Sequence, residues 1–236
     1  MAEHLVPDDL LTLLRKVDTP TVCNAIEVVH GKRGFDRFTK GTIQHSKPGD
    51  PPIVGFARTA KIAGLAPSTD DPSVIRLRRI DYFRSMAAGP NPSAAVIEDT
   101  DYPSCIAGWW GEVNVAVHKG LGLKGAITNG VMRDLDVIDD GFPVLAGSVG
   151  VSHGFVHVLE IGTVVNVFGL TVTQGELIHA DRHGALVIPS DVIPHLKRAI
   201  ETVVLNENIV LEPARQKGFN IEKLESAWAK FEARRT

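Results

Sequence analysis

The chain has 236 residues, 44% of them hydrophobic, which is enough to bury a substantial core in a single domain. Its net charge of −3 comes from interspersed charges of both signs without a Lys/Arg-rich tract, which argues against a nucleic-acid-binding protein. The N-terminal MAEHLVPDDLL lacks the basic and apolar segments of a signal peptide, and no apolar run approaches the roughly 18 residues of a membrane span. We expect a cytoplasmic protein with no membrane or nucleic-acid partner.

Two helices and a loop are predicted for the first 52 residues. An acidic pair followed by apolar residues at helical spacing predicts a short helix over about residues 8–17. A second helix is predicted with Thr19 as its N-cap and Pro20 as its first residue, ending before Gly31. Residues 31–52 are rich in glycine, lysine and proline, which indicates a loop.

A strand and a helix are predicted next. Residues 53–62, IVGFARTAKI, have the apolar and β-branched content of a strand. Asp71 and Pro72 are typical of the N-cap and first position of a helix. The predicted apolar stripe of that helix consists of Val74, Ile75, Leu77, Ile80 and Phe83.

A short apolar strand over residues 94–97 ends in a group of acids. Glu98, Asp99 and Asp101 would lie at the carboxyl end of that strand, which is the edge where ligands collect in open α/β sheets. The alternative is that these acids serve the turn that follows the strand.

The stretch from Gly108 to Asp134 carries the strongest functional signal. Glycines flank a tryptophan pair, and a helix is predicted to begin near Gly111. Because the first amides of a helix lack internal acceptors, those of Glu112, Val113 and Asn114 are candidates to bind a carboxylate.

A short strand over residues 124–130 then leads to an adjacent Arg133-Asp134 pair. An arginine can bind a carboxylate or ketone oxygen through its rigid fork of donors, while an aspartate offers hard oxygen to Mg²⁺ or Mn²⁺. The alternative is structural: Asp134 would cap a short helix, LDVID, and Arg133 would pair with a surface acid.

The last third of the chain predicts strands and then helices. Four short strands are expected between residues 164 and 188, with a hairpin turn at DRHG. A metal site at His179, Asp181 and His183 is the alternative to that turn. Ser190 and Asp191 are predicted to cap a helix to about Val210, which Pro213 interrupts, and a final amphipathic helix covers residues 220–233.

Glu112, twenty intervening residues and then Arg133-Asp134 resemble the D/E-X20-R-D signature of the RraA-like family. The segments TPTVCNAIE, GFARTAK, GFPVLAG and GELIHADRHGALVIP also resemble that family, so the resemblance covers about residues 15–190. The family includes 4-hydroxy-4-methyl-2-oxoglutarate and 4-carboxy-4-hydroxy-2-oxoadipate aldolases. It also includes non-catalytic proteins that inhibit ribonuclease E.

The resemblance implies roles for the residues of this stretch. Asp134 would ligate Mg²⁺ or Mn²⁺, Glu112 would hold a water on the metal, and Arg133 would bind the pyruvyl group. The loop from Gly111 through Val113 to Asn114 would supply amides to the pyruvate carboxylate. The Trp109-Trp110 pair departs from the usual pattern, and we expect it either to reshape the substrate pocket or to be ordinary core or interface aromatics.

The same resemblance implies a fold, an assembly and an activity. The fold would be α/β, a three-layer β/β/α swivelling-type domain over residues 1–236, with flanking N- and C-terminal helices and a helical extension from about residue 190. It would form a homotrimer or homohexamer with sites near subunit boundaries. The expected activity is that of a metal-dependent pyruvate aldolase that also decarboxylates oxaloacetate. The alternatives are a ribonuclease E-type regulator and an enolate-forming enzyme acting on another organic acid.

Overall fold

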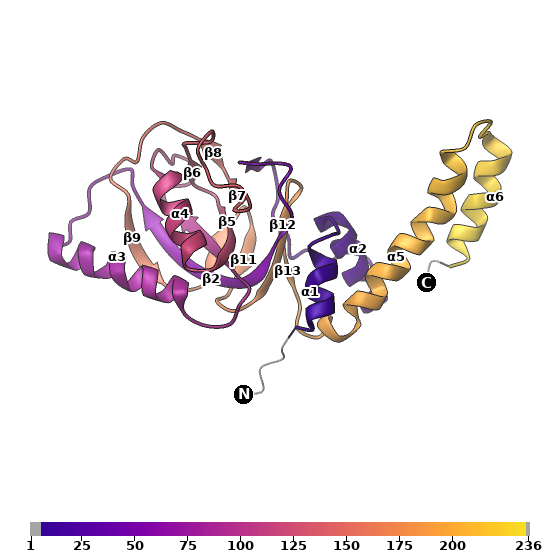
Figure 1. Ribbon diagram of the computed structural model, residues 1–236, viewed down its shortest axis with the longest axis horizontal. Coiled ribbons are helices and arrows are strands. Elements are labelled where there is room, and N and C mark those ends of the chain that lie inside the picture. Colours follow the sequence, from indigo (N-terminus) through magenta and orange to yellow (C-terminus); the bar gives the residue numbers. More distant parts are fainter. Residues whose placement is uncertain (1–5, 235–236) are drawn as a thin grey trace.

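A mixed sheet of eight strands forms the centre of the fold, which the computed structural model describes over residues 6–234 (Figure 1). The order is β1-β7-β5-β3-β2-β12-β13, and β9 pairs with the second half of β2. Strands β2, β3, β5 and β7 are parallel neighbours, whereas the other pairs in this sheet are antiparallel. The eight strands are β1 (Gln44–His45), β2 (Ile53–Ala63), β3 (Ser93–Asp99), β5 (Leu123–Thr128), β7 (Val144–Ala146), β9 (His157–Ile161), β12 (Leu177–Asp181) and β13 (Gly184–Ile188).

Both faces of this sheet are covered, as parallel strands require. One face packs against the hairpin of β10 (Val165–Val167) and β11 (Leu170–Val172), whose apolar side chains join those of β2, β3 and β5 in one core cluster. The opposite face packs against helices. The predicted strands between residues 164 and 188 are confirmed, and so is the α/β fold class with flanking helices.

A separate three-stranded parallel sheet carries the stretch of greatest interest. It consists of β4 (Gly108–Trp110), β6 (Val131–Met132) and β8 (Ser148–Val149), with β6 in the centre. Helix α4 (Glu112–Gly120) follows β4 directly and begins where the glycine signal predicted it.

The two N-terminal helices are confirmed with small corrections to their ends. Helix α1 (Asp8–Leu14) stops three residues earlier than predicted, and α2 spans Thr19–His30 with Gly31 in the left-handed conformation. The N-cap of α2 is Asp18, whose side chain accepts a hydrogen bond from the Thr21 amide at 2.9 Å. The predicted N-cap, Thr19, is the first helical residue instead.

Helix α3 (Pro72–Ala87) has the predicted start but not the predicted apolar face. Val74, Leu77 and Ile80 are exposed, whereas Tyr82 and Met86 are buried against the sheet side. The helix packs mainly against β9, so only the residues facing that strand enter the core. The choice of face depends on this tertiary partner rather than on periodicity.

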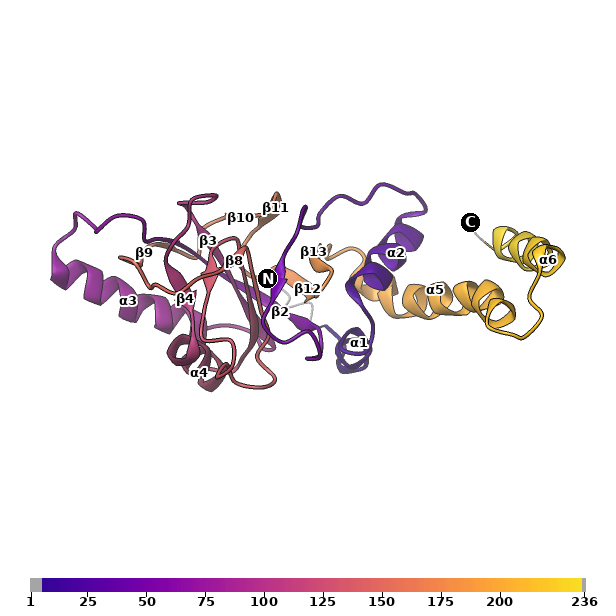
Figure 2. The ribbon, with the colours of Figure 1, turned by 90° about the horizontal axis from the view of Figure 1, so that it is seen from above.

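A helical arm projects from the sheet at the C-terminal side (Figures 1 and 2). It consists of α5 (Ile193–Ala214) and α6 (Ile221–Glu232). Only the first half of α5 carries buried residues, and these pack with α1 and α2. The predicted cap is wrong, because Val192 occupies the N-cap position without a side-chain bond. Pro213 also does not interrupt the helix, since it lies in the last turn.

No helix within residues 6–234 is long and apolar enough to cross a membrane.

Candidate functional site

The pairing of β4 with β6 brings the three predicted charges together. Gly108 lies opposite Val131, and the Arg133 amide donates a hydrogen bond to the Trp110 carbonyl at 2.8 Å. The chain therefore leaves β4 into α4 beside the point where it leaves β6. Glu112, Arg133 and Asp134 lie at this junction, 22 residues apart in sequence at most.

Asp134 contacts both of its expected partners. Its Oδ2 accepts a hydrogen bond from the Glu112 amide at 3.2 Å and lies 3.7 Å from Nε of Arg133. The side chains of Arg133 and Asp134 are each about one-third exposed, at 33% and 32%. The pair is thus held by the chain on one side and partly exposed to solvent on the other.

Two glycines make the room for this pair. A Cβ atom at Gly111 would lie 2.4 Å from Oδ2 of Asp134 and 3.1 Å from Cγ of Arg133. A Cβ atom at Gly108 would lie 3.0 Å from Cδ of Arg133. The glycines that flank the tryptophan pair therefore serve close approach of side chains to the backbone.

The alternative prediction, that Asp134 caps a short helix formed by LDVID, is wrong. Residues 135–138 form a turn and no helix, although the Asp134 carbonyl accepts hydrogen bonds from the Val137 and Ile138 amides. The backbone of Asp134 has a positive φ of 59°, which is uncommon for a residue other than glycine. The side chain faces the start of α4 instead of capping its own turn.

The predicted set of anion-binding amides is narrower than expected. The Glu112 amide already donates to Asp134, so it is not free for a substrate. The amides of Val113 and Asn114 lie in the first turn of α4, where no intrahelical acceptor is available. The Glu112 side chain has no hydrogen bond or ion pair within residues 6–234.

The tryptophan pair does not line the site. Trp109 and Trp110 are 3% and 0% exposed, and both belong to the core cluster beneath the sheet of β4 and β6. The ring of Trp110 lies 4.6 Å from that of His118 and 6.1 Å from that of Phe142. The expectation that these residues reshape a substrate pocket is therefore wrong, and the alternative prediction, that they are core aromatics, is confirmed.

His118 is buried at the centre of these aromatics and is kept neutral. Burial lowers its pKa from 6.5 to about 4, while the Asn114 carbonyl acts weakly in the opposite direction. Its neighbours Tyr82, Phe83 and Trp110 carry no charge. Folding therefore excludes a proton that the unfolded chain binds below about pH 6.5.

We expect the free energy of unfolding to fall as pH is lowered from about 6.5 to about 4, by up to about 3 kcal/mol. The contribution of neutral His118 to stability is complete above its unfolded pKa of 6.5. It is lost as pH falls towards its folded pKa of about 4. Burial also lowers the pKa of His179, so this residue likewise reduces the free energy of unfolding as pH falls. Urea unfolding between pH 4 and 7 measures the slope of the free energy of unfolding against pH. His118→Phe should reduce it and the exposed control His153→Gln should not, whereas an unchanged slope in His118→Phe would contradict the assignment.

The acids at the carboxyl end of β3 and just beyond it serve the turns and loops, as the alternative proposed. Asp101 accepts hydrogen bonds from the Gly64 and Leu65 amides at 2.7 and 2.8 Å. Glu98 accepts one from the Asn166 amide at 2.8 Å. Asp99 is buried, and burial raises its pKa.

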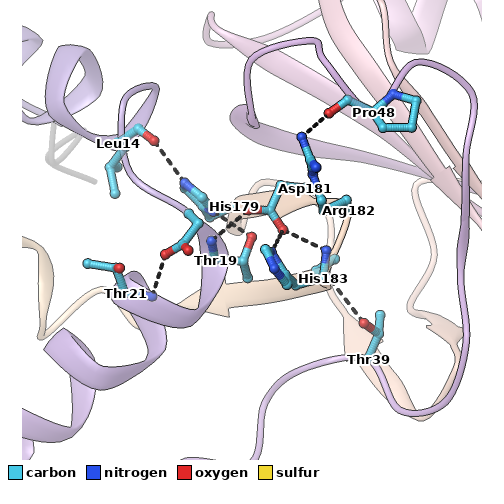
Figure 3. A network of polar contacts seen from close by, with 11 residues as sticks. Leu14, Thr19, Thr21, Thr39, Pro48, His179, Asp181, Arg182 and His183 are labelled. Carbon is cyan, nitrogen blue, oxygen red and sulfur yellow. Dashed lines mark hydrogen bonds and ion pairs between the residues drawn. The ribbon is translucent and has the colours of Figure 1, made fainter. Parts of the chain in front are cut away.

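The histidines of HADRHG belong to a structural network that docks the N-terminal helices on β12 (Figure 3). His179 donates from Nε2 to the Leu14 carbonyl at 2.8 Å and accepts at Nδ1 from Thr19 Oγ1 at 3.0 Å. Asp181 accepts from the Thr19 and His183 amides. The hairpin is confirmed, and residues 6–234 contain no group of three or more histidine, cysteine or acidic residues able to hold a metal ion.

The donor set at the junction fits a hard, largely hydrated cation. Asp134 offers one carboxylate, and Glu112, whose backbone amide donates to Asp134, carries a second, exposed carboxylate. Mg²⁺ usually keeps several waters while bound through one or two carboxylates. A zinc site would need three or four nitrogen, sulfur or carboxylate ligands, which the described part of the chain does not bring together here.

Solved structures with the same fold are known. A protein of Pseudomonas syringae pv. tomato aligns over 97% of both chains with a TM-score of 0.68 and 21% identity. RraAS2 of Streptomyces coelicolor, an unusual member of the RNase ES inhibitor RraA protein family, covers 89% of this chain and 98% of its own with a TM-score of 0.64 and 20% identity. These likenesses define the class of protein as an RraA-type α/β fold.

Sequence comparison assigns the family. The RraA-like model, Aldolase/RraA, matches residues 19–187, and the chain belongs to this family, which covers both aldolases and ribonuclease inhibitors. Protein DlpA of Legionella pneumophila is 25% identical over 121 residues, which are 50% of this chain and 19% of DlpA. The chain thus spans only a small part of the length of that relative.

Proposed function

We propose that the chain is a divalent-metal-dependent lyase that releases pyruvate from a 4-hydroxy-2-oxo diacid and decarboxylates oxaloacetate. The observation that carries the proposal is the contact of Asp134 with both Arg133 and the first amide of α4. A ribonuclease-inhibiting surface does not require an acid, an arginine and a second acid around one accessible point.

Different groups at the junction bind different parts of a 2-keto acid. The guanidinium of Arg133 presents donors to the keto oxygen and stabilises the negative charge that develops there as the carbon–carbon bond breaks. The free amides of Val113 and Asn114, at the positive end of α4, bind the adjacent carboxylate.

Asp134 and Glu112 supply the metal site. A bound Mg²⁺ or Mn²⁺ would act as a Lewis acid on the keto oxygen. Asp134 would hold the ion directly, and Glu112 would orient a water beside it and accept or return a proton. Both carboxylates are exposed enough to exchange protons with solvent.

Assembly as a trimer or hexamer stays a prediction. It is supported by exposed apolar side chains in segments that flank the junction, among them Val113, Val137, Val151 and Phe155. Light scattering measures the mass in solution, and a monomeric mass would contradict it.

Pyruvate release should depend on the metal. In an assay coupled to lactate dehydrogenase, EDTA should abolish turnover of oxaloacetate and of 4-hydroxy-2-oxo diacids, and Mg²⁺ or Mn²⁺ should restore it. Turnover that survives EDTA would exclude the metal. No turnover with any keto acid would favour the ribonuclease regulator or another organic acid.

A further inference from the structure

Beneath the junction, four side chains and two carbonyls close a buried ring of hydrogen bonds. Nε1 of Trp109 donates to the Tyr82 oxygen at 3.4 Å, and the Tyr82 hydroxyl lies 2.7 Å from Nε2 of His118. Nδ1 of His118 lies 2.5 Å from the Asn114 carbonyl. The side-chain amide of Asn114 (Nδ2) then donates to the Trp109 carbonyl at 2.6 Å, which returns the ring to the residue where it began.

The partners allow only one arrangement of protons. The Asn114 carbonyl can only accept, so Nδ1 of His118 carries the hydrogen and Nε2 accepts. The Tyr82 hydroxyl must therefore donate to Nε2, which leaves its oxygen free to accept from Trp109. Every donor then has an acceptor. A neutral His118 is required, in agreement with its burial.

The ring connects the candidate site to a distant helix. Tyr82 lies on α3, Trp109 on β4, and Asn114 and His118 on α4. Tyr82 and His118 are 0% exposed, so neither side chain can reach a ligand. The backbone from Trp109 to Asn114, however, is the turn that contains Gly111 and the free amides of Val113 and Asn114.

We propose that Tyr82 and His118 are positioning residues, which hold this turn so that its amides face the carboxylate of the substrate. The inference rests on the proposed function, because it assigns the turn to substrate binding. Two anchors fix the turn from within: Asn114 bonds to the Trp109 carbonyl, and His118 bonds to the Asn114 carbonyl. The Tyr82 hydroxyl bonds to His118 and accepts from Trp109, and so links this turn to a second helix, α3.

The test compares Tyr82→Phe with Tyr102→Phe. The chain contains two tyrosines, and Tyr102 is 49% exposed and outside the ring, which makes it a matched control. Tyr82→Phe keeps the aromatic packing and removes the hydroxyl. We expect KM for the keto acid to rise about tenfold with kcat within about twofold, because a misplaced binding group weakens substrate positioning. Tyr102→Phe should match wild type.

A second variant tests whether the ring acts as one unit. Asn114→Ala removes the donor to the Trp109 carbonyl on the opposite side of the ring. If the ring positions the turn, the effects of Tyr82→Phe and Asn114→Ala on KM should not add in the double variant. Additive effects would overturn the proposal.

Amide hydrogen exchange supplies a readout that does not need turnover. The Glu112 amide is bonded to Asp134 and the Val115 amide to the Gly111 carbonyl, and both should exchange faster in Tyr82→Phe than in Tyr102→Phe. A lower melting temperature with unchanged exchange and KM would overturn the proposal. If wild type turns over no keto acid, the proposed function fails, and the exchange result alone decides whether the ring holds the turn.

Discussion

Asp134→Ala should reduce metal-dependent pyruvate release by about 10³-fold in kcat/KM. The Asp134 carboxylate accepts a hydrogen bond from the first amide of α4 and lies 3.7 Å from Nε of Arg133, and it is the proposed direct ligand of the cation. Its removal takes away the proposed metal ligand and the acceptor of the hydrogen bond from the Glu112 amide. The same variant should lose binding of Mn²⁺ in a calorimetric titration.

A neighbouring acid provides the control for this prediction. Asp136 is exposed, lies two residues further along the chain and has no hydrogen bond or ion pair in the part of the chain that the structure describes. Asp136→Ala should retain activity and metal affinity. If both variants behave alike, general loss of negative charge would explain the result, and the assignment of Asp134 would be wrong.

Elements whose signals are local were predictable from the sequence. Helix α4 follows a glycine and begins an apolar spacing of helical period, and β2 and the hairpin of β12 and β13 are marked by apolar runs and turn residues. The meeting of Glu112 with Arg133 and Asp134 also follows from local rules, because one helix and one strand of these lengths bring the chain back to its starting point.

Features that depend on distant partners were not predictable. The buried face of α3 is set by β9, which lies more than sixty residues away along the chain. The burial of the tryptophan pair depends on Tyr82 and Phe142, on opposite sides of it in sequence. Composition alone could not distinguish a pocket wall from a core. The nearest usable signal was His118, a lone polar residue on the apolar side of a short helix.

At the site itself, the sequence identified the charges but not the space between them. Gly111 was predicted as the residue before a helix, whereas the structure shows that its missing side chain is where the Asp134 carboxylate lies. Asp134 also has a positive φ of 59°, which the spacing of the charges did not predict.

Gly111→Ala should therefore lower metal affinity and kcat/KM by at least about tenfold while the protein stays folded. The new methyl group would lie 2.4 Å from Oδ2 of Asp134, and the carboxylate must rotate away. The backbone itself tolerates alanine, since Gly111 has an extended conformation with φ −139° and ψ −176°. Loss of a glycine N-cap should cost less than about 1 kcal/mol of stability.

Gly120→Ala is the matched control, because Gly120 ends the same helix and a Cβ atom there would have no neighbour within 4 Å. It should leave metal affinity and activity unchanged. Mn²⁺ titration and the coupled pyruvate assay measure both effects, and thermal unfolding checks the fold. Gly111→Ala with wild-type metal affinity would show that the cation does not depend on the observed position of Asp134. The contact between Asp134 and the first amide of α4 would then be a structural cap, and the proposed lyase site would lose the observation on which it rests.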